Sequence, residues 1–287
     1  MHTLVDFYPP AMIYLTKENT KEEDMKDVLV TGAGGGMGSA TVRALIARGY
    51  RVFALDLNPL PEEENLIYIS ADVTNEQSVA NAYVKVREYT DTLFAVIHFA
   101  GVYMLDSLVE MPTESFRRIL DINLFGAYLV NKIFLPLLSR GSRVIITTSE
   151  LAPLDPLPFT GIYAVTKAAL DKYAYSLAME LQLLGISVSV LRAGAVDTGM
   201  IGVSVAALDR FCGKTELYSC NAARFKRIVD GVEARRISTA RLAKRAVKIL
   251  EKRRAGFAYS INRNPLLLLL NALPKRLQMF IIKMILK

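Results

Sequence analysis

A tyrosine and a lysine four residues apart, in Tyr163-Ala-Val-Thr-Lys167, are the side chains of this chain best placed to move a proton. On a helix, residues i and i+4 share a face, so the two side chains would lie together. A tyrosine has a pKa of about 10, and lowering it to about 7 requires about 4 kcal/mol. An ammonium about 4 Å away supplies roughly that much at an effective dielectric near 20. The pair is therefore predicted to do acid/base chemistry, although an amphipathic helix with a surface lysine would show the same spacing.

A glycine-rich turn, Thr31-Gly-Ala-Gly-Gly-Gly-Met-Gly38, follows a candidate strand far upstream. Glycines permit a tight turn and a close backbone approach, and the next helix would point its N–H groups and positive dipole end at a pyrophosphate. Two spacings fit, Gly32/Gly36/Gly38 and Gly32/Gly35/Gly38, and a purely structural turn is the alternative. We assign Gly32, Gly36, Met37 and Gly38 to a dinucleotide. Together with the tyrosine and lysine, the turn predicts a redox enzyme.

Acidic residues follow the second and third candidate strands. Asp56 lies eighteen residues beyond the turn, where a carboxylate accepts hydrogen bonds from the adenosine ribose and repels a 2′-phosphate. Neither Ala33 nor Leu57 offers a compensating cation, so NAD(H) is expected in preference to NADP(H). A solvated strand-end aspartate is the alternative. Asp72 and Val73 are expected at the adenine edge.

Short apolar runs alternate with longer helical patterns along the body of the chain. The candidate strands are Val28–Thr31, Arg51–Asp56, Ile67–Ser70, Leu93–Phe99, Arg143–Thr148, Ile186–Leu191 and Phe257–Ile261. The candidate helices are 37–48, 75–90, 114–138, 163–184, 221–234 and 238–253. Several strands are continuously apolar, as strands covered on both faces should be. The pattern predicts an α/β fold with a single Rossmann-type, doubly wound parallel sheet of about seven strands and helices on both faces.

Length and composition fit one large domain, since the chain has 287 residues of which 52% are hydrophobic. We divide it into an N-terminal arm (1–25), the Rossmann-type domain (26–262) and a C-terminal tail (263–287). Cys212 and Cys220 cannot form a disulfide framework and no signal peptide is recognised, so a cytoplasmic location is expected. The scattered cysteines and histidines predict no metal site.

Three further polar residues are candidates for the site or for the core. Ser149 follows the fifth strand, at the edge where open α/β sheets bind ligands, and its hydroxyl could orient a substrate oxygen. Asn123 is a polar residue in an apolar helical stretch, and a structural amide bonded to backbone is the alternative for it. His98 lies within the fourth strand and is expected to be a core histidine without a catalytic role.

From about Lys26 to about Ile261 the chain resembles the classical short-chain dehydrogenase/reductase family, which includes hydroxysteroid and retinol dehydrogenases. The turn matches the family's Thr-Gly-x-x-x-Gly-x-Gly motif, and Tyr163 and Lys167 match its Tyr-x-x-x-Lys. The resemblance implies that Tyr163 is the acid/base and that Ser149 holds the reacting oxygen. It also implies that Lys167 binds the nicotinamide ribose and lowers the pKa of Tyr163, and that Asn123 supports a water relay to Lys167.

The same resemblance extends the cofactor site and suggests an assembly. Ala100 and Gly101 match the end of the family's Asn-Asn-Ala-Gly, which reads His98-Phe-Ala-Gly101 here. The segment from Arg192 to Thr198 resembles the one that binds the nicotinamide amide, through Val196 and Thr198, with Ala-Gly in place of the usual Pro-Gly. Ser149 precedes Tyr163 by fourteen residues, one more than is usual. A homodimer or homotetramer through helices 114–138 and 163–184 is implied.

Two regions bear on the substrate and on partners. Residues 199–233 are expected to form a substrate lid, and its apolar residues favour a lipophilic alcohol or ketone; these residues are Met200, Ile201, Val203, Val205, Leu208, Phe211 and Tyr218. The tail from Ser260 carries five basic residues and no acid, so it accounts for most of the net charge of +7. Nucleic-acid binding would show a basic stripe with a recognisable reading element, and because none appears in the sequence we expect no nucleic-acid partner. Leu277, Phe280, Ile281, Met284 and Ile285 share one helical face. This pattern fits a helix lying in an anionic membrane surface, and a tail that caps the substrate pocket or a subunit interface is the alternative.

The sequence thus predicts an NAD(H)-dependent oxidoreductase that interconverts a secondary alcohol and a ketone on a lipophilic, steroid-like or retinoid-like substrate. Two alternatives remain: an extended-type nucleotide-sugar epimerase, for which the C-terminal region leaves little room, and a non-catalytic NAD-binding scaffold at a membrane.

Overall fold

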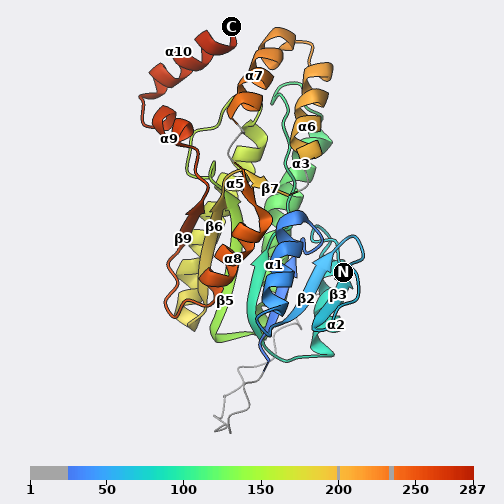
Figure 1. Cartoon of the computed structure of the whole chain (residues 1–287). Coiled ribbons are helices and arrows are strands. Elements are labelled where there is room, and N and C mark those ends of the chain that lie inside the picture. The colour runs from blue at the N-terminus through green and yellow to red at the C-terminus, as the bar shows by residue number, and fades with distance from the viewer. Residues whose placement is uncertain (1–24, 199–200, 233–235) are drawn as a thin grey trace, which may run out of the picture.

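A seven-stranded parallel sheet forms the centre of the molecule, which we describe from a computed structural model over residues 25–198, 201–232 and 236–287 (Figure 1). The strand order is β3-β2-β1-β4-β5-β6-β9. The strands are β1 (Asp27–Thr31), β2 (Arg51–Asp56), β3 (Leu66–Ser70), β4 (Leu93–His98), β5 (Leu138–Ser149), β6 (Ser187–Ala193) and β9 (Ala258–Ile261). The order reverses between β1 and β4, and such switch points are where open α/β sheets bind ligands. The predicted doubly wound sheet is confirmed.

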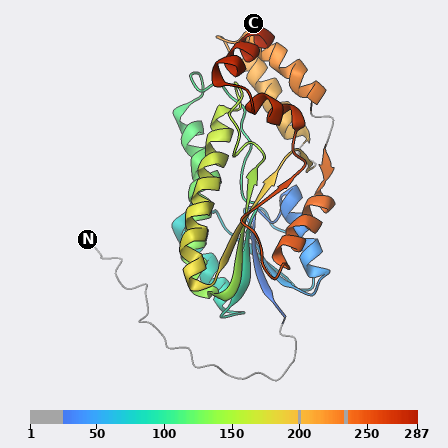
Figure 2. The ribbon, with the colours of Figure 1, turned by 90° about the vertical axis from the view of Figure 1, so that its left-hand side faces the viewer.

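Helices cover both faces of the sheet, as Figure 2 shows edge-on. The helices α1 (Gly36–Ile46) and α8 (Thr239–Leu250) pack together on one face. The other face is covered by α2 (Glu76–Arg87), α4 (Gly126–Phe134) and α5 (Gly161–Leu181). Strand β1 serves both layers, because Val28 and Val30 join the core beneath α1 and α8 while Leu29 joins the core beneath α2 and α4. Burial on both faces explains why the strands are continuously apolar.

The predicted helix 114–138 is divided in the structure. It comprises α3 (Thr113–Leu120), a π-helical turn over Asp121–Phe125, and α4, which ends at Phe134 just before Pro136. Strand β5 then begins at Leu138, five residues earlier than predicted. The run Thr113–Leu137 meets the length and composition criteria for a membrane span, but 44% of its apolar window is buried in the fold. Within the fold this run packs against α5 and α2.

Above the carboxyl ends of the strands lie the lid and the tail (Figures 1 and 2). The lid contains α6 (Ile201–Lys214), which was not predicted, and α7 (Ser219–Val232). A short parallel pair, β7 (Val196–Asp197) and β8 (Ile237–Ser238), lies at its base. The tail forms α9 (Pro265–Asn271) and α10 (Lys275–Leu286), and α10 packs against α7. The predicted arm lies almost entirely outside the described residues.

Candidate active site

One cavity of about 1860 Å³ lies at the carboxyl ends of the central strands. It is lined by the glycine turn after β1, by Asp56 and Asp72 after β2 and β3, by Ala100 and Gly101 after β4, and by Ser149 at the end of β5. Tyr163, Lys167, Val196 and Thr198 line it as well. The fold therefore brings the residues assigned from the sequence to a single cavity, except for Asn123, which is not among its lining residues.

The glycine turn fits closely against its neighbours. Gly32 has a φ of +64°, and a Cβ there would lie 2.5 Å from the backbone nitrogen of Ala100. A Cβ at Gly36 would clash with the carbonyl oxygen of Thr198, and one at Gly38 with that of Gly32. A Cβ is thus excluded at Gly32, Gly36 and Gly38, the three positions of one of the two spacings. The turn leads directly into α1, so the N-terminus of that helix faces the cavity, which is the geometry that suits a pyrophosphate.

Asp56 is held at the rim of the cavity by the turn itself. Its Oδ2 accepts a hydrogen bond of 2.9 Å from the backbone N–H of Gly34, and its Oδ1 accepts one of 3.0 Å from Asn58. The carboxylate of Asp72 is engaged within its own loop, because its Oδ1 accepts hydrogen bonds from both the N–H and the hydroxyl of Thr74, at 2.9 and 2.7 Å. Val73 packs against the position of Gly126. Asp56 is therefore better placed than Asp72 to contact a ribose.

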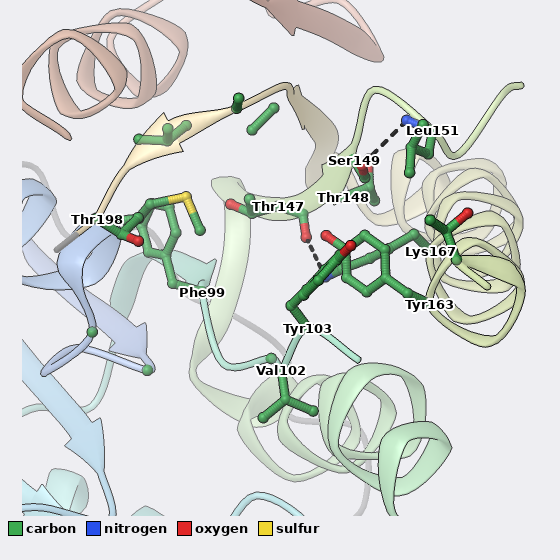
Figure 3. A pocket seen from close by; sticks show the side chains of 18 of the residues that line it. Phe99, Val102, Tyr103, Thr147, Thr148, Ser149, Leu151, Tyr163, Lys167 and Thr198 are labelled. Atoms are coloured by element: carbon green, nitrogen blue, oxygen red, sulfur yellow. Dashed lines mark hydrogen bonds between the residues drawn. The ribbon is translucent and has the colours of Figure 1, made fainter. Parts of the chain in front are cut away.

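Ser149 and Tyr163 both line the cavity, as Figure 3 shows. Ser149 is buried at the end of β5, and Tyr163 is the third residue of α5. The Ser149 side chain opposes part of the rise in the Tyr163 pKa, and the N–H of Leu151 donates to Ser149 Oγ at 3.2 Å. The extra residue in the loop before α5 therefore still leaves both groups in the same cavity. Figure 3 also places Tyr103 beside Tyr163, a neighbour that the sequence analysis missed.

Lys167 follows Tyr163 by one turn of α5 and is buried. Its Nζ donates to the carbonyl oxygen of Thr147 at 3.4 Å and lies 5.8 Å from the centroid of the Tyr163 ring. Burial lowers the pKa of Lys167 to about 8. Burial also raises the pKa of Tyr163 to about 12, and the hydrogen bond with Ser149 opposes this only in part. The expected lowering of the Tyr163 pKa by Lys167 is therefore absent among the protein's own groups, because desolvation dominates.

Asn123 lies in the π-helical turn and is 1% exposed. Its Oδ1 accepts from the N–H of Val102 at 2.7 Å, and its Nδ2 donates to the carbonyl of Val102 at 3.0 Å and to Thr166 Oγ1 at 3.1 Å. The side chain thus ties the loop after β4 to α5, as the structural alternative expected. A π-helical turn inside an α-helix is often located at a functional site. Here it places the amide between the two elements that form the wall beside Lys167.

The remaining residues considered in the sequence analysis are His98 and the apolar residues of the lid. His98 is buried in β4 with Nε2 2.9 Å from Asn131 Oδ1, and burial lowers its pKa to about 4, so the prediction of a core histidine is confirmed. In the lid, Leu208, Phe211 and Tyr218 pack with Phe159 and Phe225 and not in the cavity. Among the lid residues whose side chains are described, Phe225, Ile228 and Val229 of α7 line the cavity. Met200 lies outside the described residues, and the side chains of Ile201, Val203 and Val205 are not described.

Comparison with known proteins gives a family profile and several relatives of this chain. The short chain dehydrogenase profile matches residues 26–208. Estradiol 17-beta-dehydrogenase 2 of Mus musculus is 35% identical over 191 residues, covering 62% of this chain and 50% of that protein. The NADPH-dependent 1-acyldihydroxyacetone phosphate reductase of Schizosaccharomyces pombe is 30% identical over 183 residues, covering 61% and 62%. The chain therefore spans about half to under two thirds of the length of these relatives.

The fold has a close counterpart among solved structures. A short chain dehydrogenase from Burkholderia cenocepacia, solved in complex with NADP, superposes with a TM-score of 0.69 at 20% identity, covering 90% of this chain and 96% of that one. At this identity the likeness concerns the fold alone. The family profile, which covers more than half of the residues and includes the glycine turn and the Tyr163/Lys167 pair, shows that the chain belongs to the short chain dehydrogenase family of oxidoreductases.

Proposed function

We propose that this protein is an NAD(H)-dependent oxidoreductase that interconverts a secondary alcohol and a ketone on a lipophilic substrate. The observation that carries the proposal is that Ser149 and Tyr163 line one cavity, with Lys167 one turn further along α5. This pair lies in the same cavity as a glycine turn in which a Cβ would clash at three positions. Groups that handle a proton and a cradle for a dinucleotide are thus within one cavity.

The proposed roles follow from where these groups lie. When bound, a nicotinamide ring would accept hydride from the alcohol carbon or return it to the ketone. Ser149 Oγ donates a hydrogen bond to the substrate oxygen and fixes its position between the two hydroxyls. Tyr163 takes the hydroxyl proton during oxidation and returns it during reduction. Lys167 would bind the nicotinamide ribose, and Asn123 would support a water relay to its ammonium.

The pKa values of Tyr163 and Lys167 indicate what reduction and oxidation each require. With a pKa of about 12, Tyr163 is protonated at neutral pH and ready to donate to a ketone. Oxidation requires the tyrosinate, which must be stabilised by positive charge nearby. Lys167, with a pKa of about 8, is mostly protonated at neutral pH and supplies one such charge. The positive ring of the oxidised cofactor would supply a second one only in the oxidative direction.

The preference for NAD(H) rests on this chain's own Asp56. The carboxylate is oriented by Gly34 and Asn58 and lines the cavity, where it would meet the 2′-position of the adenosine ribose. A 2′-phosphate there would face a negative charge. The yeast relative is NADPH-dependent by name, so the preference is argued from this residue and not from similarity. Asp72 and Val73 would contact the adenine, and Val196 and Thr198 the nicotinamide amide.

A lipophilic substrate is supported by the wall of the cavity away from the glycine turn. That wall consists of apolar side chains of α7, α9 and α10; they are Phe225, Ile228, Val229, Leu266, Leu267, Leu270, Ile282, Ile285 and Leu286. The cavity of about 1860 Å³ exceeds the roughly 300–1,000 Å³ of a typical ligand site, so it has room for a substrate beside a cofactor. The two relatives act, by name, on estradiol and on an acylated ketone.

A homodimer or homotetramer through α4 and α5 completes the proposal. Large apolar side chains remain exposed on these helices and on the turn between α3 and α4; they are Phe125, Tyr128, Val165, Tyr175 and Met179. Their burial against a second copy would remove them from water. We expect light scattering to give a dimer or tetramer for the native chain and a monomer for Phe125→Glu. A native monomer at micromolar concentration would contradict this assembly.

The test of the function is turnover on a panel of hydroxysteroids, retinol and simple secondary alcohols, followed by NADH fluorescence. We expect NADH formation with lipophilic alcohols and its loss in Tyr163→Phe. Binding of NAD without turnover on any alcohol, unchanged by the substitution, would favour a non-catalytic scaffold instead. No binding of either nicotinamide cofactor would refute the proposal.

A further inference from the structure

The C-terminal tail is part of the wall of the active-site cavity. Leu266, Leu267 and Leu270 of α9 line it, as do Ile282, Ile285 and Leu286 of α10. Leu266 and Ile285 nevertheless remain 60% and 53% exposed. A side chain that both lines a cavity and meets solvent marks its rim. The cavity that contains Tyr163 therefore opens at the surface of the tail.

Polar contacts hold the inner face of the tail against the protein. Near the start of the tail, the N–H of Asn264 donates to Glu150 Oε2 at 2.6 Å. At the end of α9, Asn271 Oδ1 accepts from the N–H of Asp155 at 2.8 Å, and the Asp155 carboxylate forms an ion pair with Lys275.

At the far end, the carbonyl of Leu286 accepts from Asn221 Nδ2 of α7 at 2.6 Å, and the Leu286 side chain is buried. The tail is thus fixed at both ends, to the loop after β5 and to α7. The opposite, outer face of the tail is exposed to solvent.

The outer face of α10 is apolar. Leu277, Phe280 and Met284 occupy positions i, i+3 and i+7 and so share one side of the helix. All three are exposed, Phe280 to 59%. Leu269 of α9 is exposed as well. Single exposed apolar side chains are ordinary, but several along one helix face indicate a surface that binds a partner.

Charge identifies the kind of partner. The sequence from Lys252 to Lys287 has eight basic residues and no acid. Arg276, Lys283 and Lys287 are exposed on α10, on the flank of the apolar stripe. A second copy docked through this face would bring two basic tails together, which like-charge repulsion opposes. An apolar stripe with basic residues beside it matches instead the headgroups and upper acyl chains of an anionic bilayer.

We propose that the outer face of α9 and α10 docks this protein on an anionic lipid bilayer. Leu277, Phe280 and Met284 enter the interface while Arg276, Lys283 and Lys287 contact lipid phosphates. Because Leu266 and Ile285 form the rim, the cavity opens beside the bilayer, and a lipophilic substrate enters from it; this last step rests on the proposed function. The cytoplasmic leaflet, which carries the anionic lipids, is the surface that the charge fits.

The test is flotation of the full-length protein with vesicles, either of phosphatidylcholine alone or of equimolar phosphatidylcholine and phosphatidylglycerol. We expect the native chain to float with the anionic vesicles and to be released by salt. Phe280→Asp should weaken the partition about tenfold or more. Val84→Asp on α2 is the matched control, because Val84 is also 59% exposed, and it should float like the native chain.

Two double variants test the electrostatic contribution to membrane binding. Arg276→Gln with Lys283→Gln should reduce binding to anionic vesicles and flatten its salt dependence. Arg241→Gln with Lys248→Gln, at exposed positions of α8, removes the same charge and should leave binding unchanged.

Three results would overturn the proposal: no flotation of the native chain, equal flotation of Phe280→Asp, or a native dimer that Phe280→Asp splits without any lipid binding. The last result would identify a second copy as the occupant. NADH binding, measured on each variant in parallel, shows that the variant is folded. Failure of flotation with NADH binding and turnover intact would refute the docking and leave the proposed function standing.

Discussion

Tyr103 packs edge-on against Tyr163, with ring centroids 4.9 Å apart and ring planes at 65°. Tyr103 comes from the loop after β4, and the neighbouring Val102 is fastened on both its N–H and its carbonyl by Asn123. The ring of Tyr103 thus helps to fix the direction of the Tyr163 hydroxyl. Aromatic pairs of this kind are worth about 0.5–1.5 kcal/mol beyond the area that they bury.

Tyr103→Ala is therefore expected to lower kcat by about 2- to 10-fold, the equivalent of that energy. Tyr103→Phe keeps the ring and should retain most of kcat. Steady-state kinetics with NADH binding as a control would measure both, and NADH affinity should stay the same. If the alanine and phenylalanine variants behave alike, ring packing is not what orients Tyr163.

Asp56 is predicted to set cofactor preference through its charge. Asp56→Asn keeps an oxygen for one backbone N–H but removes the repulsion of a 2′-phosphate. The ratio of the Kd for NADPH to the Kd for NADH should fall about tenfold or more, which corresponds to about 1.4 kcal/mol. Fluorescence titration with both cofactors gives the ratio.

Asp72→Asn is the control for that prediction, because the Asp72 carboxylate bonds Thr74 and would lie toward the adenine. It should change the two affinities together and leave their ratio unaltered. A ratio that moves with Asp72 and not with Asp56 would mean that the ribose lies elsewhere.

His98 makes stability depend on pH. Its pKa is about 4 in the fold against an ordinary 6.5, because the ring is buried beside Asn131. Between these values the unfolded chain binds a proton that the folded chain does not, so stability is complete above pH 6.5 and falls as the pH drops toward 4. The free energy of unfolding should be about 2 kcal/mol smaller at pH 5 than at pH 7 from this residue alone.

Urea unfolding of the native chain and of His98→Asn at the two pH values would measure this effect. The asparagine cannot titrate, so the difference between pH 7 and pH 5 should shrink in the variant by about the same amount. An identical pH dependence in both proteins would show that His98 already titrates normally in the fold.

Much of the sheet and of the site could be predicted from the sequence, because local patterns determine them. Continuous apolar runs mark strands buried on both faces, and the carboxyl ends of parallel strands meet at one edge. That rule alone brings Gly32, Asp56 and Ser149 together. The i, i+4 spacing then places Tyr163 and Lys167 side by side.

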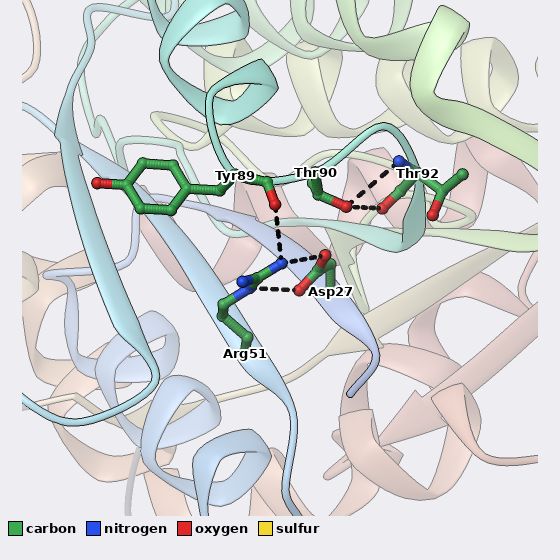
Figure 4. A network of polar contacts seen from close by, with 5 residues as sticks. All are labelled: Asp27, Arg51, Tyr89, Thr90 and Thr92. Atoms are coloured by element: carbon green, nitrogen blue, oxygen red, sulfur yellow. Dashed lines mark hydrogen bonds and ion pairs between the residues drawn. The ribbon is translucent and has the colours of Figure 1, made fainter. Parts of the chain in front are cut away.

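The remaining features depend on contacts between distant segments, which no local pattern encodes. Tyr103 reads as an ordinary loop residue, and only the tertiary fold places it on Tyr163. Helix α6 was missed in the first half of the predicted lid, where no helix was expected, and Leu208 and Phe211 of this helix pack inside the lid. Figure 4 shows another such contact, where Arg51 binds Asp27 through two hydrogen bonds of 2.7 and 2.8 Å at the opposite end of the sheet.

The Tyr163 pKa is a further case of this kind. Spacing predicts a nearby ammonium, but the sequence does not reveal how deeply the ring is buried. Desolvation raises the pKa to about 12 and outweighs the neighbours. The tail is similar: its amphipathic pattern was visible, whereas its place in the cavity wall required the structure.

The most direct test of the account is the rate of NADH formation by the native chain and by Tyr163→Phe on the best alcohol of the panel, with NADH affinity measured for both. The account predicts a loss of about 10²- to 10⁴-fold in kcat with NADH affinity unchanged, because only the proton-transfer group is removed. Turnover of Tyr163→Phe at the native rate, with NADH bound equally well, would contradict the assignment of Tyr163 as the acid/base.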